Sequence, residues 1–178
     1  MRVGPEEKQK VGAIFGVEHP LPQEYEDKAR MVTYMEVLHR IHNCLGICHM
    51  NTIHGDFDQI DLAQLAELYS TATGWKTAVE DLHRLAMRQL NLGKALNLRH
   101  TNFTRKDDLP TRRDFSEPIP SGKLAGWKID EEKFNRMLDE YYDLHGWDRK
   151  TSFPMRKTLI DLNLERVAQD LEKIGKLG

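Results

Sequence analysis

The chain has only two cysteines among its 178 residues, Cys44 and Cys48, and they lie close together. Two thiols at this spacing do not form the disulfide framework of a small secreted domain. No apolar run approaches the roughly 18 residues that a membrane-spanning helix needs. The first residues are not followed by the apolar segment of a signal peptide. We therefore expect a cytoplasmic protein without a membrane-spanning segment.

Neither sign of charge dominates the chain, whose formal net charge is -2 with lysine and arginine dispersed along it. This distribution lacks the basic patch of a nucleic-acid-binding protein, so we expect no nucleic-acid partner. A hydrophobic content of 39% and a charged content of 30% are typical of a globular protein. The length is sufficient for one domain with a real core. We expect residues 1–178 to form a single helical domain.

Apolar residues recur at helical spacing along most of the chain. This periodicity predicts helices over residues 23–45, about 61–73, 75–98, 130–146, 154–162 and 164–171. No segment of useful length alternates between apolar and polar residues, so the predicted fold class is all-α. Residues 100–128 are polar, aperiodic and contain several prolines. They predict a long polar loop in an irregular multi-helix domain, and such loops often carry function or form interfaces.

The densest group of reactive side chains is the segment His42–His49, hereafter the cysteine segment, which holds both cysteines. Thiolates bind zinc and iron–sulfur clusters, and His42, His49 or His54 could complete a zinc site, although the spacing matches no standard finger. The segment is also one residue longer than the CxxCH haem-attachment signature. Cysteines four apart on a helix could instead form a dithiol switch. Alternatively, both are small buried residues that close a helix. The residues alone leave these alternatives open.

The order of several short motifs resembles the C-terminal third of the tungsten-containing aldehyde:ferredoxin oxidoreductase family. The segment Asn43-Cys44-Leu45-Gly46-Ile47-Cys48 is similar to that family's Asp-x-x-Gly-Leu-Cys motif. The other matching fragments follow in the family's order, at Leu68–Trp75, Leu96–Arg99, Phe103–Pro110, Glu117–Pro118, Leu138–Tyr142 and Gly146–Asp148. Each fragment is weak alone, but together they extend over about a hundred residues, which chance rarely produces.

This resemblance implies roles for individual residues of the cysteine segment. Cys48 takes the place of the fourth ligand of a [4Fe-4S] cluster, whose other three ligands come from a preceding domain. Asn43, Gly46 and Ile47 would lie against one of two pyranopterin ligands of a tungsten ion. Asn43 replaces an acidic residue that hydrogen-bonds the pterin, so the negative charge is lost there, although an amide can still donate and accept. Cys44 is no ligand in this interpretation, and we expect it to be buried on the helix.

The resemblance further implies that the chain is the cofactor-enclosing C-terminal domain of an oxidoreductase that interconverts aldehydes and carboxylic acids. Its partners would be the remaining domains of the same subunit or a split partner chain, together with a ferredoxin-type electron carrier. A homo-oligomer is compatible with this picture. The fragment alone should be inactive, because one thiolate does not hold a cluster. Two alternatives are the tungsten subunit of an aromatic acyl-CoA-reducing complex and a cofactor-free helical interaction module.

Four charged residues near the long loop, Arg99, Arg105, Asp107 and Asp108, allow two interpretations. They could line the approach to the cofactor or the seam with the missing domains, or they could be ion pairs that fix the loop. His42 lies on the apolar side of its helix, where a core or seam histidine is expected.

The large aromatic residues are interpreted as structural. Trp75 and Trp147 each follow a glycine at a helix end, where a large apolar ring locks the turn. Tyr141 and Tyr142 are adjacent, so we expect one to pack inward and the other to point outward.

Overall fold

The computed structural model of the chain describes residues 9, 12–13, 15–18, 24–51 and 60–178. Its longer helices are α2 (Lys28–Leu45), α3 (Leu62–Thr73), α4 (Val79–His100), α6 (Glu131–His145) and α8 (Glu165–Lys173). The shorter ones are η1 (His49–Asn51), η2 (Arg105–Asp108), α5 (Arg112–Ser116) and α7 (Arg156–Asp161). The described residues form no strand, and the predicted all-α fold is confirmed. None of these helices is long and apolar enough to cross a bilayer.

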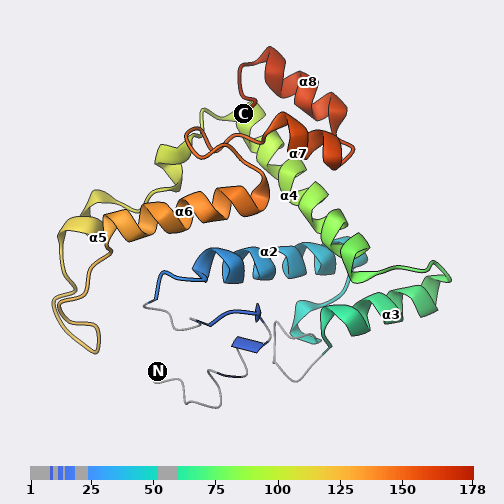
Figure 1. The fold of residues 1–178 in the computed structure, drawn as a ribbon, viewed down its shortest axis with the longest axis horizontal. Helices are drawn as coiled ribbons and strands as arrows, with labels where there is room; N and C mark the ends of the chain where they lie inside the picture. The colour runs from blue at the N-terminus through green and yellow to red at the C-terminus, as the bar shows by residue number, and fades with distance from the viewer. Residues whose placement is uncertain (1–8, 10–11, 14, 19–23, 52–59) are drawn as a thin grey trace.

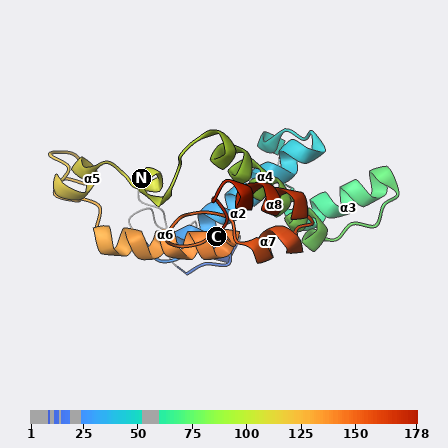
Figure 2. The same ribbon diagram turned by 90° about the horizontal axis from the view of Figure 1, so that it is seen from above.

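Helix α4 is the element around which the others are arranged (Figure 1). Helices α2 and α6 pack against each other, and α2 also packs on α4. Helix α3 contacts α4 from one side, whereas α8 contacts α4 near the opposite end. Seen from above, the molecule is elongated, with α5 at one end and α3 at the other (Figure 2). The cysteine segment begins in the last turn of α2 and therefore lies towards the α3 end.

Two helices begin at aspartates that the sequence marks as caps. The Asp61 carboxylate accepts a hydrogen bond from the Gln64 backbone N–H at 2.8 Å, and the Gln64 side chain accepts one from the Asp61 N–H. The Asp130 carboxylate likewise accepts from the Lys133 N–H at 3.0 Å. Each cap satisfies a backbone donor that the first helical turn leaves without a partner. The starts of α3 and α6 therefore follow from local sequence.

The apolar side chains form three clusters. The first joins α2, α3 and the first half of α4 and includes Ile41, Leu65 and Ala86. The second joins the last turns of α4 to α7 and α8 through Leu98, Leu159 and Leu171, and the third surrounds Tyr142 and Trp147 at the end of α6. Helix α4 thus contributes to two cores, which fixes the distance between the α3 and α8 ends of the molecule.

Two expectations about Trp75 need correction. Helix α4 begins at Val79 rather than at Trp75, because the Asp81 carboxylate caps the N–H of Ala78. The Trp75 side chain is 71% exposed and does not lock the turn, whereas Trp147 is 7% exposed and packs as expected. The polar segment 100–128 is mostly irregular, as expected, and its two short helices are η2 and α5.

Both tyrosines of the adjacent pair contact the interior. Tyr142 is completely buried, and Tyr141 is half-buried with its hydroxyl 3.1 Å from each carboxylate oxygen of Glu36. The expectation that one of them points outward is wrong. The rings of both pack near Trp147, with centroids 5.9 and 6.1 Å away. Neighbouring helix positions can both be inward here because α2 covers one side of α6 and η2 the other.

Candidate functional site

The cysteine segment consists of the last turn of α2 and the turn that leads from it to η1. The Gly46 backbone has a φ of 69°, in the left-handed region that favours glycine, and its N–H bonds to the His42 carbonyl. The Ile47 N–H donates to the same carbonyl at 3.0 Å. The chain then enters η1 at His49. These two hydrogen bonds set the direction of the backbone on which Cys48 stands.

The two cysteines are both exposed and both free thiols. The expectation that Cys44 is buried on the helix is therefore wrong, as is the alternative in which both thiols are buried. The physical reason is the end of α2, where Leu45 and Ile47 fill the space against the first core and leave Cys44 on the outer side. An exposed Cys48 thiol is accessible to a ligand that comes from outside the described residues.

Asn43 and Gly46 are also exposed, and Ile47 is half-buried. Apart from its chain neighbours, no described residue places a heavy atom within 4 Å of the position that a Cβ on Gly46 would take. A flat group can therefore approach this backbone closely. The four residues that the family resemblance singles out thus lie together at the end of α2 and in the turn that follows it.

Histidine rings at the end of α2 and in η1 contact one another. The His42 and His49 rings are stacked with centroids 6.3 Å apart, and the His39 ring is tilted against His49 at 5.0 Å. His42 is completely buried, in agreement with the prediction of a core histidine. The rings therefore connect the end of α2 to η1.

Metal ligation by this chain alone finds no support among the described residues. They contain no group of three or more histidine, cysteine, aspartate or glutamate side chains placed to hold a metal ion. His54, which the zinc alternative includes, lies outside the described residues. An iron–sulfur cluster on Cys48 therefore needs thiolates from outside the described part of the chain.

A second polar cluster anchors η2 to α6. The Arg105 guanidinium donates to the Asp139 carboxylate at 2.5 Å and to the Asn135 side-chain oxygen at 3.0 Å. The Asp108 carboxylate accepts the Tyr142 hydroxyl at 2.6 Å. Arg105 and Asp108 therefore act as loop-fixing residues.

The remaining two members of the charged group behave differently from each other. Asp107 caps the turn by accepting the Thr104 N–H at 2.8 Å. Arg99 is not brought to this cluster, because its side chain lines a groove between α4 and α8. Only three of the four charged residues are thus gathered in one place.

Electrostatics at this cluster follow from burial. Burial raises the pKa of the Tyr142 phenol, and its hydrogen bond to the Asp108 carboxylate raises it further. Burial lowers the pKa of the Lys94 ammonium, while Asp108, 3.7 Å away, acts in the opposite direction. The Lys94 ammonium also lies 4.5 Å from the centroid of the Trp147 ring.

Sequence reasoning missed the buried network that links α2, α4 and α6. The His145 ring is completely buried, with Nε2 3.0 Å from a Glu36 oxygen and Nδ1 2.8 Å from the Tyr141 carbonyl. Asn91, also buried, accepts the Trp147 indole N–H at 2.9 Å. The sequence signal for Asn91 is a polar residue on the inward side of α4. No comparable signal marks the partnership of Glu36 with His145, whose positions are 109 apart.

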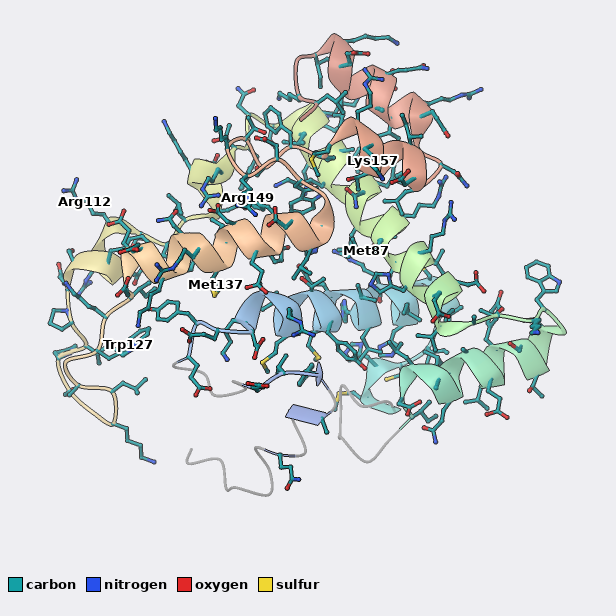
Figure 3. All side chains as sticks on the ribbon, viewed as in Figure 1. Met87, Arg112, Trp127, Met137, Arg149 and Lys157 are labelled. Atoms are coloured by element: carbon teal, nitrogen blue, oxygen red, sulfur yellow. The ribbon has the colours of Figure 1, made fainter. Side chains whose placement is uncertain are left out.

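A cleft of about 240 Å³ lies between α2 and α6 beside this network. Its walls include Val32 and Leu138, and the polar groups at its edge are Lys28, Asp108 and Tyr141. Met137 lies on the side of α6 that faces α2 (Figure 3). The cleft is at the opposite end of α2 from the cysteine segment, so the two do not form one site.

The fold is that of a helical domain known from a larger redox enzyme. A chain in the solved structure titled "Active site complex BamBC of Benzoyl Coenzyme A reductase in complex with 1,5 Dienoyl-CoA" is similar to this one with a TM-score of 0.68 at 24% identity. The match covers 89% of this chain and 22% of that chain. At this identity the likeness shows the fold.

Sequence comparison then gives the family. The model described as aldehyde ferredoxin oxidoreductase, domains 2 & 3, matches residues 3–164, and the chain belongs to this family. The tungsten-containing aldehyde ferredoxin oxidoreductase of Pyrococcus furiosus is 26% identical over 132 residues, which cover 74% of this chain and 20% of the relative. The enzyme of the same name from Pyrococcus abyssi is 27% identical over 140 residues, which cover 79% of this chain and 22% of the relative. The chain thus spans about a fifth of the length of the curated relatives it matches.

Proposed function

We propose that the chain is the C-terminal, cofactor-enclosing part of a tungstopterin and [4Fe-4S] oxidoreductase that interconverts aldehydes and carboxylic acids. Membership of the family supports this proposal, as does the exposed cysteine at the position of the family's motif. When bound, the two cofactors supply a two-electron change at the tungsten and one-electron transfer to a ferredoxin-type carrier. The remaining domains of the subunit, or a split partner chain, would provide the rest of the site.

In this proposal four residues of the cysteine segment each have one task. Cys48 gives its thiolate as one ligand of the cluster, for which its exposure on the turn is suitable. Gly46 presents bare backbone to a pterin, and Ile47 anchors the turn to the first core. Asn43, exposed in the last turn of α2, would offer an amide to the pterin. Cys44 is exposed too, but it lies inside the helix and outside the family's ligand position.

The experiment that tests this proposal compares the two thiols of the cysteine segment. We expect the complete protein that carries this sequence to be brown and to contain iron and tungsten. Cys48→Ser should lower the iron content and the visible absorbance by about half or more, because a cluster usually needs four protein ligands. Cys44→Ser is the matched control and should leave both nearly unchanged. Equal losses in the two variants would contradict the assignment of Cys48.

The chain alone should bind neither cofactor and show no activity, since its described residues offer no complete ligand set. A colourless, metal-free complete protein would instead favour the interaction-module alternative. In that case the exposed thiols would have no cofactor role, and segment 100–128 would be the docking surface to examine.

A second candidate function rests on the structural neighbour. Its title names benzoyl coenzyme A reductase, and the replacement of the family's acidic residue by Asn43 departs from the aldehyde-oxidising pattern. The chain would then be part of the tungsten subunit of a complex that reduces an aromatic acyl-CoA. Assays of the complete protein with an aldehyde and an oxidised viologen, or with a reduced viologen and an aromatic thioester, separate the two functions.

A further inference from the structure

The contact between α2 and α6 contains a buried histidine whose two ring nitrogens both have partners. The His145 side chain is completely buried, and its Nδ1 lies 2.8 Å from the backbone carbonyl oxygen of Tyr141. Its Nε2 lies 3.0 Å from a carboxylate oxygen of Glu36 on α2. A carbonyl and a carboxylate are both hydrogen-bond acceptors, so each ring nitrogen needs a proton to make its contact attractive.

A neutral imidazole cannot supply both of these protons. With the proton on Nδ1, the lone pair of Nε2 would face the Glu36 oxygen. With the proton on Nε2, the lone pair of Nδ1 would face the Tyr141 carbonyl. Each neutral form therefore leaves two acceptors in contact at a buried position, which costs free energy. One additional proton on the pair of Glu36 and His145 removes this conflict.

The surroundings of Glu36 favour the ring, rather than the carboxylate, as the place of that proton. The Tyr141 hydroxyl lies 3.1 Å from each oxygen of Glu36. Burial and the adjacent carboxylate raise the pKa of this phenol, so the hydroxyl stays neutral and donates to Glu36. A hydrogen bond to a carboxylate favours its charged form. The Glu36 side chain is also partly exposed, so water solvates its charge.

Other charged and titratable groups lie on the helices around the pair. They are Lys94 of α4, Asp108 of η2, Tyr141 and Tyr142 of α6, and His39 and Arg40, one turn beyond Glu36 on α2. The Trp147 ring contacts both the Lys94 ammonium and the His145 ring, with its centroid 4.5 and 4.8 Å away. Asp108, 3.7 Å from that ammonium, offsets its charge. Glu36 is therefore the charged group in hydrogen-bonding contact with the ring.

We propose that His145 carries protons on both ring nitrogens in the folded protein and that loss of the Nε2 proton weakens the contact between α2 and α6. The two helices lie side by side and pack directly on each other (Figure 1). The bound proton stabilises the folded state at low pH, and this stabilisation is lost as the pH rises. Because the cysteine segment begins in the last turn of α2, the proton also affects how firmly that segment is held.

Exchange of the imidazole C2 hydrogen with deuterium tests the protonation of His145 in the complete protein. The rate of this exchange rises with pH while the ring is protonated and becomes constant once the ring is neutral. Measured by mass spectrometry on the peptide that contains His145, the rate should still rise above about pH 6. A rate that is already constant at that pH would show a neutral ring and overturn the proposal.

Glu36→Gln separates the effect of this carboxylate from that of a histidine in general. The glutamine amide can donate to an unprotonated Nε2, so the neutral ring then satisfies both of its contacts. The C2 exchange rate of His145 should therefore become constant at a lower pH in this variant than in the parent. An unchanged profile would show that Glu36 does not hold the proton on the ring.

Backbone amide exchange tests the contact between the helices. Between about pH 6 and 9, the amides of α2 and α6 should lose about tenfold in protection after correction for the intrinsic rates, whereas those of α8 should not. Glu36→Gln should abolish this loss. Glu132→Gln, which removes an exposed partner of Arg136 on α6, is the matched control and should retain it. Equal protection of the parent at both pH values, or the same loss in Glu36→Gln, would contradict the proposal, and the measurements on the parent need no variant to fold.

Discussion

Tyr142 shows how a single residue connects burial, hydrogen bonding and pH dependence. Its phenol is buried and donates to Asp108, and both effects favour the neutral form. Because the pKa is raised in the folded state, the stabilisation is complete below the unfolded pKa of about 10 and is lost as the pH rises above it. Alkaline conditions should therefore unfold the chain partly through this group.

Replacing Tyr142 with phenylalanine should reduce this loss. At pH 7 we expect the free energy of unfolding to fall by about 1 kcal/mol, because Asp108 loses a hydrogen bond. Between about pH 10 and 12 the variant should lose stability more slowly than the parent, since phenylalanine cannot ionise. Urea unfolding at several pH values measures both effects. Tyr69→Phe is the control, and an equal change in pH dependence there would contradict the assignment.

At the same scale, the Glu36–His145 pair is suited to a double-mutant cycle. The Tyr141 carbonyl can only accept a hydrogen bond, so the Nδ1 of His145 donates, and its Nε2 faces the Glu36 carboxylate. Glu36→Gln should lower the free energy of unfolding by about 2 kcal/mol, below the range for fully buried pairs because Glu36 is 34% exposed. The effect should be smaller in a His145→Gln background, where the Tyr141 hydroxyl is the remaining partner of Glu36. Full additivity of the two changes would show that the pair is not coupled.

Individual helices begin and end largely at residues that hydrogen bonds and backbone conformation within one turn determine. The caps at Asp61 and Asp130 and the left-handed glycines Gly46 and Gly146 could be predicted from sequence, because they act within one turn. The exposure of Trp75 could not, since burial depends on elements distant in sequence.

The candidate site, too, could be predicted from the sequence only in part. The turn that holds Cys48 was predictable from its glycine and from the family motif, whereas its exposure was not, because Leu45 and Ile47 determine it by packing. The network of Glu36, His145 and Asn91 is formed by three separate helices. No spacing within one helix reveals such a network.

Two helix-ending glycines differ in surroundings and offer a matched comparison. Gly146 has a φ of 69°, and a Cβ there would lie 2.2 Å from the Thr158 hydroxyl oxygen. Gly74 has a φ of 75°, and among the described residues no atom beyond its chain neighbours lies within 4 Å of the position of its Cβ. Gly74→Ala should cost about 1 kcal/mol of backbone strain, and Gly146→Ala about 2–4 kcal/mol, because overpacking adds to strain. Thermal unfolding monitored by circular dichroism compares them, and equal losses would show that Thr158 moves aside freely.

For the molecule as a whole, α4 joins two cores. Ile41 belongs to the first core and Leu98 to the second, and both are completely buried. Replacing either with alanine should lower the free energy of unfolding by about 2–5 kcal/mol. Because α4 carries both cores, each variant should show one common transition in urea. A curve with two steps, of which Leu98→Ala moves only one, would show that the cores unfold independently.

The shared helix also has a consequence for the newly made chain. Leu98 leaves the ribosome about 60 residues before Leu159, its partner in the second core, which at about 5–20 residues per second is a delay of roughly 3–12 seconds. During that interval the last turns of α4 have left the ribosome, whereas α7 and α8, which cover them in the folded protein, have not yet been synthesised. We therefore expect nascent-chain chaperones to bind the apolar side chains at the C-terminal end of α4.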